Sequence, residues 1–341
     1  MSGGVEVKGP PGVYRLLNLH LRTASRVVLR LGQFSAPDLQ TLGKELRQVP
    51  LERYWDGKQP VRLGISSQRS ALNFRRQILP VASAAWRLPL EEPGNSPHGC
   101  PLLLQLRLDR DVCTVSVDTT GELLHRRGYR QETSVAPARE TLAAAMLWWA
   151  GYRGDEPLVD PMCGAGTILI EGAWIALHRA PGSRRRFAFE EWPSFDGSAW
   201  REELECARRA ELSRPHDRIV GFDIHAGSLG VARRNARRAD ALDHLRLERA
   251  DIRALPARQE QPPALVAVNL PYGKRVGEPS KLKDLYRDLA GVLRAKFAGC
   301  RAVLLVPESK LGKSVGIEVH QRLRVHNGGL RCQFLLGPIG T

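Results

Sequence analysis

The chain has 341 residues, of which 43% are hydrophobic, and it carries a formal net charge of +15. This composition excludes an intrinsically disordered chain, and the length allows two or three domains with cores of their own. No apolar run approaches the ~20 residues of a membrane-spanning helix, and the start MSGGVEVKG lacks the apolar segment of a secretion signal. We therefore expect a cytoplasmic protein without membrane contact. The basic excess favours a polyanionic partner, although genomes rich in arginine codons produce the same excess.

The six cysteines are scattered along the chain, and no pair has the close spacing of a zinc-binding or redox motif. We expect free thiols and no bound metal. The expected oligomeric state is a monomer.

Residues 5–60 alternate short strands and helices, as is typical of an α+β domain. GVEVKG and RVVLRLGQF have strand patterns, and PPGVYRLLNLHLRTAS and DLQTLGKELRQVP have helix patterns, the second capped by Asp38. Residues 61–128 form a second unit with strands VRLGISS, LLLQLRLDR and CTVSVDTTG and a basic helix, RSALNFRRQILPVASAAWRL, interrupted near Pro80. Arg69, Arg75 and Arg76 lie in or beside this helix, where they either meet phosphates or form an ordinary solvated surface.

The stretch EPLVDPMCGAGTILIEGAWIAL, residues 156–177, predicts a strand, a tight turn and a helix that begins at Thr167. Gly164 and Gly166 permit a left-handed backbone and a close ligand approach, and the helix N-terminus offers free N–H groups. Asp160, at the strand end, can accept hydrogen bonds from an ammonium. The pattern suits a ligand with a carboxylate and an amine, such as the methionine part of S-adenosylmethionine, or it is an ordinary strand-to-helix turn.

A helix, APARETLAAAMLWWAG, precedes this turn, and its Glu140 and Thr141 either face the ligand or lie on the helix surface. An insertion at residues 178–218 follows the turn and is too polar for a core and too aromatic for a plain linker. It is either a substrate surface or a structural cap over the sheet. The residues that indicate a substrate surface are Arg184, Arg185, Arg186, Phe187 and Trp192.

Two further strands end in acids. RIVGFDIH predicts a strand that ends in Asp223, which either bonds the ribose hydroxyls, as this acid does in dinucleotide and S-adenosylmethionine pockets, or only caps the strand end. LRLERADIRALP supplies Asp251 where the loop of the third strand meets the adenine in such pockets. Strands and helices alternate from residue 136 onward, so we expect a doubly wound sheet with ligand atoms at the carboxyl ends of its strands. A terminal hairpin turns at Asn327 and Gly328.

The segment VAVNLPYGKR supplies the fourth strand of this sheet and a loop suited to holding an exocyclic amine. The Asn269 side-chain oxygen and the Leu270 carbonyl can accept the two amine hydrogens, which turns the nitrogen lone pair toward a methyl donor. Pro271 stiffens the loop, and Tyr272 can stack on a base extruded from its helix. The order of these segments predicts an S-adenosylmethionine-dependent amine methyltransferase.

The segments SVDTTGELLHRRGYR, APARETLAAAMLWWAG, DPMCGAGTILIEGA, FAFEEW and NLPYGKR resemble the THUMP-containing RNA guanine-N2 methyltransferases. The resemblance implies a partial ferredoxin-like domain at residues 1–60, a THUMP domain at 61–125 and a Rossmann-like methyltransferase domain at 126–341. The first two would bind structured RNA, either rRNA or tRNA. The third would methylate the N2 amine of a guanosine.

The resemblance also implies a site. Asp160 and the loop from Cys163 to Thr167 would bind methionine, with Asp223 on the ribose and Asp251 on the adenine. The expected catalytic residues are Asn269, Leu270, Pro271 and Tyr272. The expected cofactor-binding residues are Thr141, Asp160, Pro161, Met162, Cys163, Gly164, Ala165, Gly166, Thr167, Asp223, Ile224, Asp251, Ile252 and Asn269.

The sequence departs from the family pattern in two respects. Its start matches the second strand and following helix of the ferredoxin-like domain, so we expect the first strand and helix to be absent. Leu270 stands where many relatives have proline and retains the carbonyl acceptor. Alternative hypotheses are methylation of adenine N6 in DNA or of a glutamine amide in a release factor, and an RNA-binding factor with a vestigial methyltransferase domain.

Overall fold

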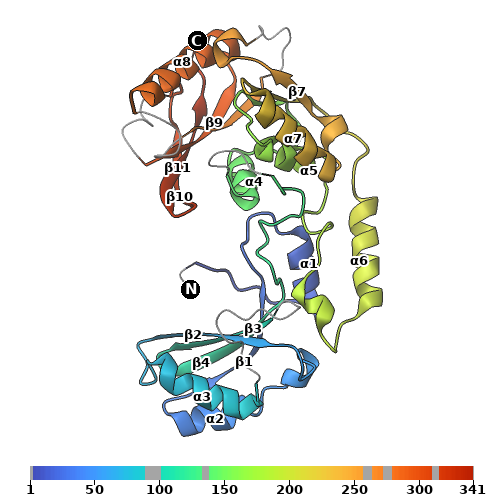
Figure 1. Cartoon of the computed structure of the whole chain (residues 1–341), viewed down its shortest axis with the longest axis vertical. Coiled ribbons are helices and arrows are strands. Elements are labelled where there is room, and N and C mark those ends of the chain that lie inside the picture. Colours follow the sequence, from blue (N-terminus) through green and yellow to red (C-terminus); the bar gives the residue numbers. More distant parts are fainter. Residues whose placement is uncertain are drawn as a thin grey trace. The chain divides into compact units, whose positions relative to one another are not determined.

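The computed structural model describes residues 3–88, 101–132, 138–255, 263–271, 279–308 and 315–340. The described residues form two compact units, Met1–Leu124 with Arg185–Glu205, and His125–Arg184 with Cys206–Thr341 (Figure 1). The insertion is therefore divided between the units. Within the described ranges, no helix combines the length and apolar character that crossing a bilayer requires.

Among the described residues of the first unit, four strands form a sheet in the order β1-β4-β3-β2. β1 and β3 pair antiparallel with β4, whereas β2 and β3 run parallel. Helices α2 and α3 lie side by side on one face of this sheet (Figure 1). The bounds are β1 Val28–Ser35, α2 Leu39–Leu46, β2 Val61–Gln68, α3 Arg75–Trp86, β3 Leu102–Asp109 and β4 Val112–Asp118.

This sheet does not divide at residue 60, where we expected one domain to end. β1 comes from the expected partial ferredoxin-like domain, and it pairs along its whole length with β4 from the expected THUMP domain. The pairing covers the outer edge of the β3–β4 hairpin, whose backbone groups would otherwise lack sheet partners. The expected strand GVEVKG is not formed, and Val5 in this segment is 91% exposed.

Helix α3 differs from its prediction in two ways. It begins at Arg75 rather than near Arg69, which has a left-handed backbone with φ 51°. It also continues through Pro80 instead of stopping there. Proline has no N–H, so the carbonyl of Arg76, four residues earlier, loses its helical partner. Arg76 and Pro80 are both exposed, so water can solvate this carbonyl.

Most aromatic residues of the insertion are buried within the first unit. Phe187, Phe189 and Trp192 are 3%, 0% and 3% exposed, and Trp192 packs against Tyr14 with ring centroids 5.2 Å apart. Arg185 donates to the Leu123 carbonyl at 2.8 Å. These contacts favour the structural interpretation of this part of the insertion, since buried rings cannot stack on a substrate. The elements involved are α1 Val13–His20, η1 Leu51–Arg53, η2 Ala188–Glu191 and α6 Gly197–Arg209.

Seven strands from the described part of the second unit form a mixed sheet in the order β10-β11-β9-β8-β5-β6-β7. β9, β8, β5, β6 and β7 are parallel, and β11 and β10 continue the sheet antiparallel. The order reverses between β5 and β8, so the doubly wound α/β prediction is confirmed. The strand bounds are β5 Leu158–Asp160, β6 Ile219–Asp223, β7 Arg246–Arg249, β8 Leu265–Asn269, β9 Arg301–Pro307, β10 Gln321–Asn327 and β11 Leu330–Pro338.

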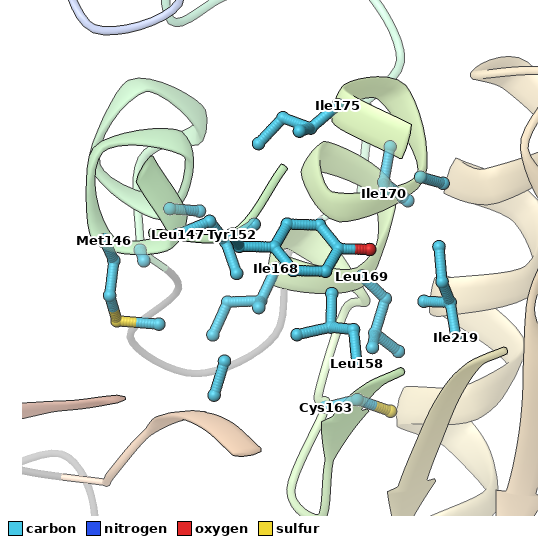
Figure 2. Packing of buried hydrophobic residues seen from close by; sticks show 14 of the residues in the cluster. Met146, Leu147, Tyr152, Leu158, Cys163, Ile168, Leu169, Ile170, Ile175 and Ile219 are labelled. Carbon is cyan, nitrogen blue, oxygen red and sulfur yellow. The ribbon is translucent and has the colours of Figure 1, made fainter. Parts of the chain in front are cut away.

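Helices cover both faces of this sheet. The core on one face joins α4, α5 and α7 to residues of β5 and β8, and the core on the other face joins α8 to alternate residues of β8 and β9. Figure 2 shows Leu147 of α4, Leu169 of α5 and Leu158 of β5 packed together in the first core. The helix bounds are α4 Glu140–Trp149, α5 Thr167–Ala176, α7 Ala226–Arg238 and α8 Pro279–Phe297, with the short turns η3 Leu242–His244 and η4 Ile252–Ala254.

Glycines bring helix α5 close to the sheet. A Cβ at Gly172 would lie 2.3 Å from Cδ2 of Leu158, and one at Gly221 would lie 2.2 Å from Cδ1 of Leu169. Both distances are shorter than van der Waals contact, so this helix can approach the strands only because side chains are missing there. The close approach fixes the N-terminus of α5 directly beyond the end of β5.

Candidate active site

The carboxyl ends of β5, β6 and β8 border a cavity of about 590 Å³ in the second unit. Asp160 ends β5, Asp223 ends β6 and Asn269 ends β8, and all three line this cavity. Parallel strands end at the same edge of a sheet, so three segments that are far apart in the sequence meet here. The lining residues are Ala138, Asp160, Pro161, Met162, Cys163, Gly164, Ala165, Thr167, Ile168, Asp223, Ile224, His225, Ser228, Ala250, Asp251, Ile252, Arg253, Asn269, Pro271 and Leu285.

The turn after β5 has the left-handed geometry that its glycines predict. Gly164 has φ 53° and Gly166 has φ 81°. A Cβ at Gly166 would also lie 3.1 Å from the Cβ of Ala232 in α7, so this position combines a glycine backbone with a close contact. Thr167 and Ile168, the first residues of α5, line the cavity. The positive end of this helix therefore borders the cavity, where it favours an anionic group.

Asp223 connects the end of β6 to this turn. Its Oδ2 accepts a hydrogen bond from the Gly164 backbone N–H at 3.0 Å, and its Oδ1 accepts one from the His225 N–H at 2.8 Å. The carboxylate is thus held by backbone groups on both sides. This arrangement fixes the acid relative to the glycine turn.

Asp160 is a buried acid beside another acid. Its side chain is 1% exposed, and Oδ1 accepts a hydrogen bond from the Met162 N–H at 3.0 Å. Burial raises the pKa of Asp160 to about 8 against the lowering effect of that hydrogen bond, and the charge of Asp223 raises the pKa further. A cation bound in the cavity would offset both unfavourable effects.

Asp251 follows β7 and caps the short turn η4. Its Oδ1 accepts from the Arg253 N–H at 2.9 Å, and its Oδ2 lies 3.5 Å from Nη1 of the same arginine. Nη2 of Arg253 lies 2.8 Å from Oδ2 of Asp288 in α8. The guanidinium therefore connects Asp251 to α8 at the rim of the cavity.

The loop after β8 is held from two sides. The Leu270 N–H donates to the Leu305 carbonyl of β9 at 3.1 Å, and the Tyr286 hydroxyl of α8 donates to the Pro271 carbonyl at 3.1 Å. Tyr286 is 1% exposed, so its hydroxyl is a buried donor. These bonds fix the backbone on both sides of the Leu270 carbonyl. Tyr272 lies outside the described residues.

The segment before α4 is held by charged groups. Arg130 donates to the Ala138 carbonyl at 2.7 Å, and its Nη2 lies 3.0 Å from Oε2 of Glu140. Burial raises the pKa of Glu140 to about 7 despite the nearby Arg130. These contacts fix Ala138 where it lines the cavity.

Most of the expected site residues meet at this cavity, but three do not line it. Thr141 is buried in α4, Gly166 packs against α7, and the Leu270 side chain is fully buried in the core. Ala138 borders the cavity in place of Thr141, because it lies just before the helix begins.

The lining residues that sequence reasoning missed fall into two groups. His225, Ala250 and Ile168 adjoin or nearly adjoin expected residues, so a wider window around each motif would have included them. Arg253 likewise follows the expected Ile252, and Ala138 lies in the segment that contains the expected Thr141, whereas Ser228 and Leu285 come from helix positions without a motif. In the described part of the chain, no three His, Cys, Asp or Glu side chains gather in an arrangement that could hold a metal.

Comparison with known proteins identifies relatives along the chain. Residues 127–333, more than half of the chain, match the RMKL-like methyltransferase domain family. The ribosomal RNA large subunit methyltransferase K/L of Syntrophotalea carbinolica is 36% identical over 94% of this chain and 47% of its own length. The Synechocystis sp. protein slr0064, provisionally named an RNA methyltransferase, is 30% identical over 97% of this chain and 88% of its own length.

A solved structure has the same architecture. The crystal structure of the methyltransferase-like protein SMU.472 with bound SAH matches 96% of this chain and 87% of that chain, with a TM-score of 0.79 and 27% identity. The chain spans about half the length of its K/L relative. The mixed α/β sheet with its cavity at the carboxyl edge is therefore a methyltransferase fold. The chain belongs to the RMKL-like methyltransferase domain family.

Proposed function

We propose that this chain transfers a methyl group from S-adenosylmethionine to the exocyclic N2 amine of a guanosine in structured RNA, either rRNA or tRNA. One observation carries the proposal. A glycine turn at a helix N-terminus, the buried Asp160 and the half-buried Asp223 at the ends of neighbouring strands, and an amide at the end of β8 all border the same cavity. These groups match the charges and hydrogen-bonding groups of the cofactor and a target amine.

The cofactor's charges fit the groups around the turn. An α-ammonium suits Asp160, whose pKa is raised by burial and by Asp223, and a carboxylate suits the N-terminus of α5. Asp223 and Asp251 are the acceptors for the ribose hydroxyls and the adenine amine. S-adenosylmethionine, when bound, supplies an electrophilic methyl group on a sulfonium.

The chain's own contribution to the reaction is to position the amine. The Asn269 Oδ1 and the Leu270 carbonyl accept the two hydrogens of the target NH2, so that its lone pair faces the methyl group. The amine proton leaves after transfer, when the nitrogen has become positively charged, so a strong general base is unnecessary. Stacking of Tyr272 on the extruded base completes the proposal.

Two observations support RNA as the substrate class. Relatives that match almost the whole chain are named as RNA or rRNA methyltransferases, and the chain carries a net charge of +15. The guanosine N2 specificity rests on the sequence resemblance. DNA adenine and protein glutamine amides are the competing substrates because similar amide-containing loops act on them.

Labelling with methyl-tritiated S-adenosylmethionine tests the proposal on rRNA, tRNA, DNA and release-factor protein. We expect label in RNA, and nucleoside mass spectrometry should identify it as N2-methylguanosine. Label in DNA or protein would contradict the substrate class. Tight RNA binding without any calorimetric signal for S-adenosylmethionine would instead identify an RNA-binding factor.

A further inference from the structure

We propose that the β10–β11 hairpin binds the phosphates that flank the target nucleotide, through one exposed basic face. This basic hairpin face consists of Arg322, Arg324, His326 and Arg331. The inference rests on the proposed RNA substrate and adds a substrate-binding surface within the methyltransferase unit itself.

The strand register gives the distance between this hairpin and Asn269, which begins the loop after β8. We call this loop, whose described residues are 269–271, the amine loop. Asn269 of β8 pairs with Leu305 of β9, Leu305 pairs with Phe334 of β11, and Phe334 pairs with Leu323 of β10. These four residues form a row across the sheet. Neighbouring strands are ~4.8 Å apart, so the backbone of β10 lies roughly 14 Å from Asn269.

The direction of the strands brings the hairpin tip to the cavity side of the row. β8 and β9 run in parallel toward the carboxyl edge, and β11 runs the opposite way. Residues after Leu323 in β10 and before Phe334 in β11 therefore lie beyond the row, toward that edge. The pairs Arg324–Gln333 and His326–Arg331 and the turn at Gly328 occupy this extension.

The two sides of β8 carry different groups at this edge. β5, β6 and the segment after β7 contribute the acids that line the cavity. Among the described residues, β9, β11 and β10 contribute no cavity lining. These strands form the half of the sheet beyond the amine loop (Figure 1). A substrate chain that reaches Asn269 can follow the carboxyl edge of this half without crossing the segments that fit the cofactor.

The hairpin's two faces differ in character. Residues that pair directly in an antiparallel ladder share a face, so Arg324 lies with Gln333, and His326 lies with Arg331. The opposite face carries Cys332 and Phe334, which are buried in the core. The basic side is not wholly solvent-facing, because Leu335, the partner of Arg322, is buried in the other core, but the side chains of Arg322, Arg324, His326 and Arg331 are exposed.

The charge of the basic hairpin face fits a polyanion. The Arg324 side chain is 85% exposed, and its Nε lies 2.9 Å from Oε1 of Glu308. An exposed ion pair of this kind contributes only about 0–1 kcal/mol, so a phosphate can compete with Glu308 for the guanidinium. Alternate residues of a strand are ~6.8 Å apart, which presents the arginines as a row along the hairpin.

The test compares two variants that lose the same charge. Arg324→Ala/Arg331→Ala removes two cations from the hairpin, and Arg237→Ala/Arg294→Ala removes two exposed cations from the last turns of α7 and α8, away from the carboxyl edge. Affinity for a fluorescein-labelled single-stranded RNA is measured at several salt concentrations, together with kcat/KM for an rRNA that the wild-type chain methylates. Calorimetry with S-adenosylmethionine checks that the cavity is intact.

We expect the hairpin variant to bind RNA about 10-fold more weakly and its salt slope to fall by about 1.4, the value for two phosphate contacts with a single strand. The control should keep the wild-type slope. Glu308→Gln should act in the opposite direction and raise RNA affinity about twofold, because Arg324 loses its carboxylate partner.

Equal RNA binding and equal kcat/KM in the hairpin and control variants would overturn this inference while leaving the proposed function intact. A change in sedimentation of the hairpin variant without a change in RNA binding would also overturn it, because the face would then bind a second copy of the chain. Failure of the proposed function is distinct, since the wild-type chain itself would then leave RNA unmethylated.

Discussion

The two halves of the seven-stranded sheet end in contrasting chemistry. On one side of β8, the acids Asp160 and Asp223 accept backbone hydrogen bonds and line a cavity. On the other side, the β10–β11 hairpin exposes Arg324 and Arg331. Backbone N–H groups hold the two acids in fixed positions, which suits a small cationic ligand. The arginines instead lie along a surface that a chain of phosphates can follow. Asn269 lies at the boundary between the halves.

Removal of the amide at the boundary, Asn269, should have the largest effect. Asn269→Ala should lower methyl transfer about 10²–10³-fold, the usual cost of losing one fixed hydrogen-bonding group at a reacting centre. Single-turnover transfer of a tritiated methyl group to RNA measures this effect. Calorimetry should show S-adenosylmethionine binding within about threefold of wild type, because the acids around the glycine turn are unchanged. Full activity in the alanine variant would exclude Asn269 from amine positioning.

On the acidic side of β8, the buried carboxyl group of Asp160 can be tested by substitution. Asp160→Asn should weaken S-adenosylmethionine binding about 10–100-fold, because the amide cannot carry the charge that balances the ammonium. In the wild-type chain, Asp160 is protonated below its pKa of about 8, and a cationic ligand favours its ionised form. Affinity measured by calorimetry should therefore rise with pH toward 8 and level off above it. Asp160→Asn should lose this rise, and a variant that retains it would assign the titration to another group.

The glycine turn is tested by a matched pair of substitutions. Gly166→Ala should lower the free energy of unfolding by about 1–3 kcal/mol, because φ is 81° and the new methyl group would lie 3.1 Å from Ala232. Gly227→Ala in α7 meets no atom within 4 Å and should be neutral or slightly stabilising. Urea unfolding of both variants measures the difference. Equal stabilities would show that the turn can relax without cost.

The smallest expected effect concerns the support of the amine loop. Tyr286→Phe removes the hydroxyl that donates to the Pro271 carbonyl and should lower kcat about 3–10-fold without changing S-adenosylmethionine affinity. Tyr152→Phe is the control, because Tyr152 is also 1% exposed but packs in the core behind α4 and α5. Similar losses of activity and of melting temperature in both variants would indicate a general packing effect.

Local patterns predicted the elements on the acidic side of β8 for a physical reason. The strand, glycine turn and helix start at Asp160 to Thr167 are encoded within a few residues, and each acid directly ends its strand. Pairings between distant segments could not be predicted in this way. The pairing of Val28 with Asp118 joins segments separated by most of the first unit, and no local signal specifies it.

The burial of aromatic residues also depends on contacts between distant segments, which local sequence does not specify. The sequence made Phe187 and Trp192 equally consistent with a substrate surface and with a structural cap, because a polar segment with rings fits both. Their burial depends on Tyr14, which comes from the opposite end of the first unit's sequence. The cavity lining at Ser228 and Leu285 was missed for a related reason, since helix positions without a motif become neighbours only in the folded chain.

A crystal structure of this chain with S-adenosylhomocysteine tests the central claim most directly. We expect the ligand's ammonium to lie beside Asp160, its ribose to contact Asp223, and its sulfur to face Asn269 across the cavity. A ligand bound elsewhere, or one whose sulfur points away from Asn269, would contradict it.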